Sequence, residues 1–375
     1  MKIIKQLLLQ IRVHSMSNKP MRFFPKESLG EKPHRFKSLI INKLYPSAFL
    51  IFFAFLSCEK ALVSADPKNT PTENVKFVWK TINEKYPFFE YKGVNWDSVG
   101  NVWIPRVRDT MNDATVFRVI DSMLYTLKDG HTNLFGSFNF SRNWEWYLSY
   151  PDNYNATLVE RNYLKNDYRF TGSLINRFLD NNNVGYVRYS SFSSNISDFD
   201  IDVVVGRFQN TKGIIIDVRS NGGGSISNVN QLVSRFIDKK LLAYKDAEKN
   251  GPGRKDFSAL KDNYIEPKGD KKYLKPVIIL TNRRCYSATT LFVASMLNLP
   301  NVKVIGDWTG GGGGTPTSTQ LPNGWIIRYS GTNTFTPAGF NIENGTPPTI
   351  KQDLSKSDEA AGIDSIIERA LKELK

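Results

Sequence analysis

The feature that most constrains the fold of this 375-residue chain is a series of short apolar segments in its second half. Residues 213–218, 277–280 and 302–305 are almost continuously apolar, which is typical of strands buried on both faces. Residues 184–189 form another expected strand. Glycines follow the 213–218 segment, and helical patterns follow it and the 277–280 segment. Strand, tight turn and helix in repetition predict an α/β core over residues 184–375.

The segment before this core predicts a small helical domain over residues 73–133. Thr70 and Glu73 form a capping-box pattern with a proline between them, so a helix is expected to begin there and to end near Tyr86. A second helix is expected from about Asp113, with Gly130 as its C-terminal cap. Residues 134–183 are rich in aromatic residues and asparagine and show no clear period, so no fold is assigned to them. The chain is expected to end in one helix over residues 359–374.

The first 58 residues account for most of the net charge of +14. They hold ten Lys or Arg and two Glu, and the remaining charge shows no arginine-rich stripe, so a nucleic-acid partner is not expected. The basic stretch precedes an apolar run at residues 48–56, which is too short to span a bilayer and is typical of a signal peptide. Leu56-Ser57-Cys58 resembles a bacterial lipobox, which predicts lipidation of Cys58 and a tether over residues 59–72. The alternative is an ordinary signal peptide with a chance cysteine.

Ser287 is the candidate nucleophile because it follows a buried strand and begins a helix. A hydroxyl at that place is surrounded by free N–H groups of the helix N-terminus, which can hold an oxyanion. A serine there could also serve only as a helix cap. The glycines at 222–224 follow a second strand and could supply another N–H from Gly223, or form a plain turn.

His131 is the candidate general base. The other two histidines, His14 and His34, fall in the expected leader, so any Ser–His mechanism in the mature chain must use His131. A lone histidine can equally be structural. A second histidine is missing from the mature chain and Cys285 is its one cysteine, so no metal site is expected.

Six blocks in the same order resemble the S41 serine peptidases, which include the C-terminal processing proteases and the tricorn core protease. The blocks are LKDGHT at 127–132, VGYVRY at 184–189, GIIIDVRSNGGG at 213–224, CYSA at 285–288, VIGDWTG at 304–310 and ENGTPP at 343–348. The resemblance implies a crotonase-like core. It also implies Ser287 as nucleophile, His131 as base, Glu343 as the acid that fixes the imidazole, and Gly223 and Ala288 N–H as the oxyanion hole.

Two departures from the processing proteases bear on mechanism. The position of their catalytic lysine falls on Gly312, so the resemblance implies the tricorn-like serine–histidine–glutamate arrangement. Thr290 replaces a glutamate often found after the nucleophile. The fifty residues at 134–183 are also too few for the PDZ domain that the processing proteases insert, so recognition of substrate C-termini by such a domain is not expected.

We therefore expect an exported, lipid-anchored serine peptidase in a bacterial envelope, acting on peptides or proteins through an acyl-enzyme and needing no metal or cofactor. One alternative is a binding protein on the same fold, since a fold does not guarantee activity. Others are an esterase or amidase, and a structural surface lipoprotein.

Overall fold

The computed structural model describes residues 68–375. The expected leader, Cys58 and most of the expected tether lie outside the described residues. Within residues 68–375, no helix combines the length and apolar character needed to cross a membrane.

The core is built on a seven-stranded sheet of order β13-β9-β8-β5-β4-β3-β2. Its strands β4, β5, β8, β9 and β13 are parallel, and β2 and β3 complete one edge in antiparallel pairing. The four predicted core strands are confirmed within one residue at each end. The sheet strands are β2(Arg169–Thr171), β3(Leu174–Leu179), β4(Val184–Arg188), β5(Gly213–Asp217), β8(Val277–Thr281), β9(Val302–Gly306) and β13(Ile350–Lys351).

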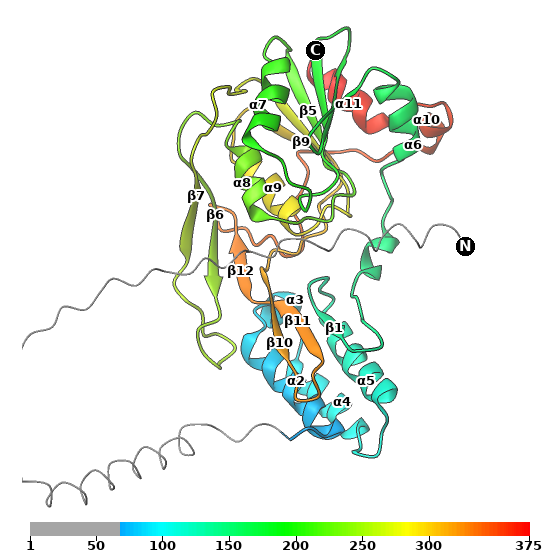
Figure 1. Cartoon of the computed structure of the whole chain (residues 1–375), viewed down its shortest axis with the longest axis vertical. Coiled ribbons are helices and arrows are strands. Elements are labelled where there is room, and N and C mark those ends of the chain that lie inside the picture. The colour runs from blue at the N-terminus through cyan, green and yellow to red at the C-terminus, as the bar shows by residue number, and fades with distance from the viewer. Residues whose placement is uncertain (1–67) are drawn as a thin grey trace, which may run out of the picture. The chain divides into compact units, whose positions relative to one another are not determined.

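Helices cover both faces of this sheet, which explains why its central strands β5 and β8 are apolar along most of their length (Figure 1). Alternate residues of β5 point to opposite sides: Ile214 and Ile216 join one core and Ile215 joins the other. The first core contains α7, α8 and α9, and the second contains α11 and the α6–η3 segment. These elements are α6(Ala156–Leu158), the π-helical η3(Val159–Leu164), α7(Asp198–Arg207), α8(Ile226–Val233), α9(Ala288–Met296) and α11(Ser365–Glu373).

The expected C-terminal helix over 359–374 is wrong as a single element. It is two helices, α10(Lys356–Ala360) and α11. Gly362 adopts a left-handed φ of 78° between them, and Asp364 caps α11 by accepting the N–H groups of Ile366 and Ile367.

The N-terminal helices form a separate hydrophobic core. The two predicted helices are confirmed as α2 and α5, and Thr70 accepts the Glu73 N–H at the start of α2. Gly130 is not the cap of α5, because that helix ends at Tyr125 with Thr126 as its cap residue. This part contains α2(Pro71–Lys85), α3(Phe89–Lys92), α4(Trp96–Trp103), η1(Ile104–Arg106), α5(Asp113–Tyr125) and β1(Asn133–Phe135). The short helix η2(Glu145–Ser149) follows β1 in the chain and contributes no residue to this core.

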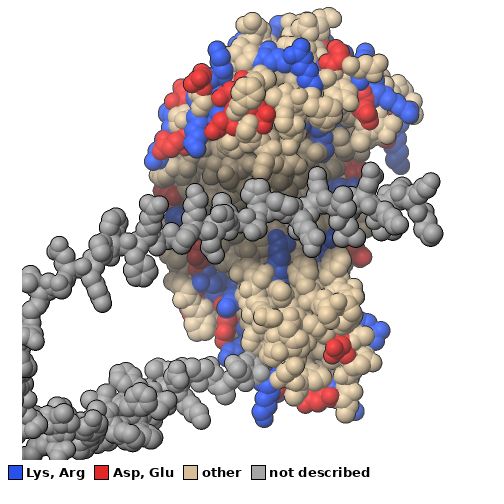
Figure 2. Space-filling view, in the orientation of Figure 1, with Lys and Arg blue, Asp and Glu red and all other residues tan. Residues whose placement is uncertain are grey.

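A later segment of the chain returns to this helical core. Strands β10(Pro316–Gln320) and β11(Ile326–Ser330) form a three-stranded sheet with β1, and Leu321, Trp325, Ile327 and Tyr329 pack among the N-terminal helices (Figure 1). The linear boundary predicted at residue 133 did not anticipate this contribution. A third sheet consists of β6(Leu241–Glu248), β7(Lys261–Ile265) and β12(Thr332–Phe335). On the face drawn in Figure 2, acidic and basic side chains are interspersed and form no stripe of one sign.

Candidate active site

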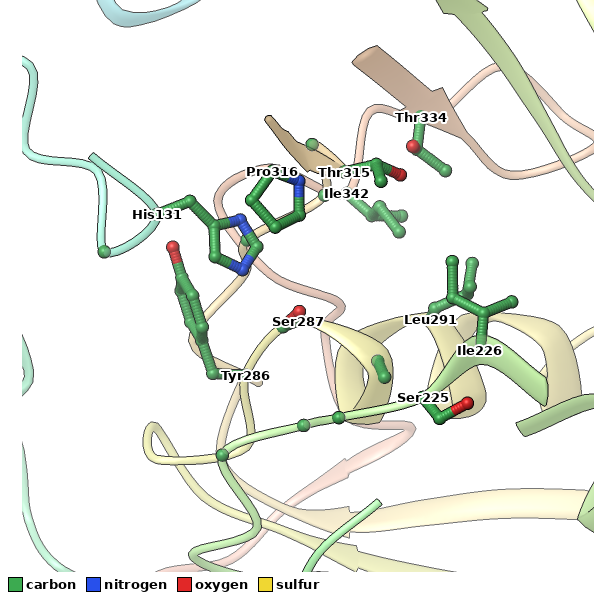
Figure 3. A pocket seen from close by; sticks show the side chains of 18 of the residues that line it. His131, Ser225, Ile226, Tyr286, Ser287, Leu291, Thr315, Pro316, Thr334 and Ile342 are labelled. Carbon is green, nitrogen blue, oxygen red and sulfur yellow. The ribbon is translucent and has the colours of Figure 1, made fainter. Parts of the chain in front are cut away.

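A pocket of about 780 Å³ contains both His131 and Ser287. Four segments far apart in the sequence form most of its wall: residues 130–131, residues 222–227, residues 286–288 with Leu291, and residues 312–316. Figure 3 shows the His131 ring and the Ser287 hydroxyl on facing sides of this pocket, with Tyr286 beside the ring. The fold thus brings the two predicted residues to one cavity. The described residues include no hydrogen bond between the imidazole and the hydroxyl.

Ser287 has a backbone conformation that serine rarely adopts. Its φ of 57° and ψ of −122° lie outside the regions that ordinary residues favour. The strained turn is held by the Ser287 N–H, which donates to the Gly311 carbonyl at 2.8 Å. Its side chain makes no capping hydrogen bond to α9. A plain helix cap therefore does not explain this serine, whereas a strained turn that directs a hydroxyl into a pocket suits a nucleophile.

Gly223 lies directly against the turn that carries Ser287. A Cβ placed on it would fall 2.6 Å from the Tyr286 carbonyl oxygen and 2.8 Å from the Ser287 Cβ, so only glycine fits there. The Gly223 N–H donates to the Asn221 side-chain oxygen at 3.0 Å. The Ala288 N–H, at the start of α9, has no hydrogen-bond partner among the described residues. Ala288 thus offers a free donor beside Ser287, and Gly223 offers one that Asn221 now occupies.

The His131 imidazole is buried, and its Nδ1 has no hydrogen-bond partner within residues 68–375. Burial lowers its pKa to about 4, with the Asp129 carboxylate acting in the opposite direction and the Arg328 guanidinium adding to the lowering. The ring packs edge to face on Tyr286, with centroids 5.1 Å apart. At neutral pH the imidazole is therefore uncharged and able to accept a proton.

Asp129 is the carboxylate associated with His131. Its Oδ1 accepts the His131 backbone N–H at 2.8 Å and the Tyr286 hydroxyl at 3.4 Å, and its Oδ2 accepts the Ser330 hydroxyl at 2.9 Å. Burial favours the neutral acid, but the charge of Lys92, the charge that His131 carries once it is protonated, and the hydrogen bonds from the His131 N–H and Ser330 outweigh it and lower the pKa of Asp129. A negative charge is thus held beside the imidazole. Asp129 falls within the LKDGHT block, although the sequence alone did not single it out.

Glu343 is paired with a lysine from the helical part. Its Oε1 lies 2.8 Å from the Lys92 ammonium, and its Oε2 accepts the Gly313 N–H at 2.9 Å. No hydrogen bond joins Glu343 to His131 among the described residues, and Glu343 lines a different pocket of about 400 Å³, which shares Tyr286 with the first pocket but contains neither His131 nor Ser287. Burial raises the pKa of Glu343 to about 7, against the lowering effect of Lys92. Nothing in the spacing of the sequence pointed to Lys92.

Tyr286 occupies the space that a side chain at position 312 would need. Gly312 has a φ of 75°, and a Cβ on it would fall 2.5 Å from two carbon atoms of the Tyr286 ring. The same ring lines the pocket that contains His131 and two further pockets. The absence of a lysine at position 312 is thus matched by a tyrosine that fills its place.

Comparison with known proteins assigns this chain to a family. The model "Peptidase family S41" matches residues 183–352, and "Tricorn protease C1 domain" matches residues 67–125. The crystal structure of a "putative peptidase" from Parabacteroides merdae is 40% identical, with a TM-score of 0.79, over 82% of this chain and 97% of that one. The chain belongs to peptidase family S41. The predicted family and the predicted α/β core with a helical N-terminal part are confirmed.

Other S41 relatives are more distant. The carboxy-terminal processing protease CtpB of Bacillus subtilis is 28% identical over 169 residues, which are 44% of this chain and 33% of that protein. CtpA of the same organism is 26% identical over 178 residues, 47% of this chain and 36% of that one. The chain thus matches about a third of the length of these relatives. Mature CPAF in complex with lactacystin shares the fold, with a TM-score of 0.61 and 13% identity over 81% of this chain and 98% of that one.

Proposed function

We propose that this S41 family member is an exported serine peptidase that hydrolyses peptide bonds through an acyl-enzyme on Ser287. The observation that carries the proposal is the shared pocket: an uncharged imidazole and a serine hydroxyl on a strained turn face the same cavity. Nucleophilic catalysis by a serine–histidine pair requires a hydroxyl that is free of a capping role and a neutral imidazole that can take its proton.

In the proposed reaction, the Ser287 oxygen attacks the peptide carbonyl while His131 takes the hydroxyl proton. His131 then returns that proton to the leaving amine, and a water molecule, activated in the same way, releases the acid. The free Ala288 N–H is the first oxyanion donor. Gly223 becomes the second once its N–H turns from Asn221 to the oxyanion. Each such donor typically contributes about 3 kcal/mol to the transition state.

The imidazolium formed during the reaction requires a nearby negative charge, and we assign this task to Asp129. Its carboxylate opposes the lowering of the His131 pKa by burial, so it favours the protonated ring. Glu343 then acts indirectly. Its ion pair with Lys92 holds the ammonium group in place, and the charge of that group keeps Asp129 ionised. The glutamate of the serine–histidine–glutamate group is thus proposed to act through charge rather than by direct contact with the imidazole.

Peptide turnover tests this proposal against its rivals. The wild-type protein is expected to cleave an unstructured protein such as casein, and Ser287→Ala and His131→Ala are expected to lose nearly all turnover while keeping the fold, typically by several orders of magnitude. Hydrolysis of esters but not of peptides would favour the esterase reading. Binding of peptides without turnover of either substrate would favour the binding protein.

Export and lipid anchoring form a separate part of the proposal. They rest on the basic and apolar segments of residues 1–58 and on the lipobox-like Cys58. Cells expressing the full chain with radiolabelled palmitate are expected to yield a labelled protein in the membrane fraction, and Cys58→Ser is expected to abolish the label. An unlabelled wild-type protein would leave an ordinary signal peptide as the explanation.

A further inference from the structure

Arg328 lines the pocket of Ser287 from the helical side of the molecule. Its neighbours on β11, Ile327 and Tyr329, are buried in the helical core, so the alternation of the strand directs Arg328 to the opposite face. In the sheet, Arg328 is paired with Asn133 of β1, two residues beyond His131. The guanidinium therefore belongs to the His131 end of the pocket, and its charge is strong enough there to lower the pKa of His131.

The charge of Arg328 has no counterion within residues 68–375. Its one hydrogen bond is to the Asn133 side-chain oxygen at 3.4 Å, and no carboxylate of the described residues forms a salt bridge with it. Two of the three buried arginines among the described residues, Arg219 and Arg235, are each paired with two aspartates, and the third, Arg188, donates to the Tyr154 hydroxyl and the Asp217 carbonyl. A half-buried guanidinium that faces a substrate pocket without a partner favours an anionic group on the ligand, and its planar fork suits a carboxylate.

The acidic side chain in the pocket wall does not neutralise Arg328. Asp246 lies on β6 opposite Thr334 of β12, and Figure 3 shows Thr334 on the side of the pocket away from His131. The Asp246 carboxylate accepts a hydrogen bond from the Asn263 side chain at 2.6 Å. The pocket therefore has a cationic end near His131 and an anionic end near Thr334.

The chemistry of the proposed reaction gives this polarity a direction. His131 must deliver its proton to the leaving nitrogen, so the part of the substrate that follows the scissile bond has to lie at the His131 end. That part of a peptide ends in a carboxylate. We infer that Arg328 binds a carboxylate of the leaving fragment, and so selects peptides with a negative group shortly after the scissile bond. This inference rests on the proposed function, because it takes its direction from Ser287 and His131.

The carboxylate has two sources, the α-carboxylate of the peptide's C-terminus or an acidic side chain near it. Three fluorescein-labelled hexapeptides of alanine and leucine separate them: one with a free C-terminus, one with a C-terminal amide, and one amidated but with aspartate in the last position. Binding is measured by fluorescence anisotropy to the Ser287→Ala protein, which cannot cleave the peptides. Charged hydrogen bonds of this kind change affinity by about 10- to 100-fold.

The free-acid peptide is expected to bind at least about 10-fold more tightly than its amide. Adding Arg328→Gln should abolish that difference, and Arg328→Lys should retain part of it. Arg118→Gln, on the exposed surface of α5, is the matched control and should change nothing. Tight binding of the aspartate amide would assign the site to an acidic side chain, and weak binding would assign it to the C-terminus.

Equal binding of all three peptides, or binding of none, would overturn the inference, as would a preference that survives in an Arg328→Gln protein with an unchanged melting temperature. These outcomes are distinguishable from failure of the proposed function, because the binding assay does not use the Ser287 hydroxyl. If peptide binding does not depend on Arg328 but the wild type still cleaves peptides, only the role of Arg328 is rejected. If binding depends on Arg328 but the wild type does not cleave peptides, the proposed peptidase activity is rejected instead.

Discussion

Replacing Gly312 with alanine tests whether the Tyr286 ring fills the space of the missing lysine. The substitution has two costs. A non-glycine residue at the Gly312 φ of 75° costs about 1–2 kcal/mol. The new Cβ, 2.5 Å from the Tyr286 ring, adds the about 1–3 kcal/mol typical of overpacking. We expect a total loss of about 2–5 kcal/mol in the free energy of unfolding.

Gly339 provides a matched control, because it has a similar φ of 87° and nothing within 4 Å of its virtual Cβ. Gly339→Ala should therefore show the backbone cost alone. Both variants lose the same flexibility in the unfolded chain, so their difference isolates the contact with Tyr286. Urea unfolding followed by tryptophan fluorescence gives the two values, with the slope of the transition checked for each variant.

The contact also predicts a coupling between the two positions. In a Tyr286→Ala background, Gly312→Ala should cost about 1–3 kcal/mol less than in the wild type, because the ring that it strikes is gone. Equal costs for Gly312→Ala and Gly339→Ala, or the same cost in both backgrounds, would refute the reasoning. By the same argument, Gly312→Lys should not create a serine–lysine dyad while Tyr286 remains in place.

Three further predictions concern the charged groups around His131. The kcat/KM for a peptide should stay nearly constant as the pH falls from 8 to about 5 and drop only as it approaches 4, because His131 must be uncharged and its pKa is about 4; a drop centred near 6.5 would contradict this. Asp129→Asn should lower kcat/KM at least about 10-fold and move the acid limb of the pH profile to lower pH, because the carboxylate acts to raise the His131 pKa. An acid limb that does not move would show that Asp129 has no influence on the imidazole. Lys92→Met should destabilise the protein by about 3–5 kcal/mol in urea, because it leaves the buried Glu343 unpaired, and Lys92→Met with Glu343→Leu should recover much of the loss; no recovery would argue against the ion pair as the cause.

The core of the fold was predictable because its signals are local. Strands buried on both faces are apolar along most of their length, and this is visible in residues 214–216 and 277–280 without any knowledge of their partners. The start of α2 was similarly set by Thr70 and the residues beside it. The return of Trp325 to the helical core could not be predicted, because nothing in a local pattern says which distant surface an apolar strand will cover.

The residues of the candidate site also differ in how far the sequence could predict them. Ser287 and His131 stand out because each combines a reactive group with a recognisable local setting, a strand end or a motif block. The surroundings that tune them come from contacts across the chain: Lys92 to Glu343 over 251 positions, and Tyr286 to Asp129 over 157. Only the folded chain reveals that Tyr286 occupies the space above Gly312.

The most direct test of the central claim is to locate the adduct after treatment with a fluorophosphonate, by peptide mapping and mass spectrometry. We predict one modified residue, Ser287, in the wild-type protein. His131→Ala should remove the modification although the hydroxyl is still present, because no base remains to take its proton. An unmodified wild type, an adduct on another residue, or full modification of the His131→Ala protein would contradict the account.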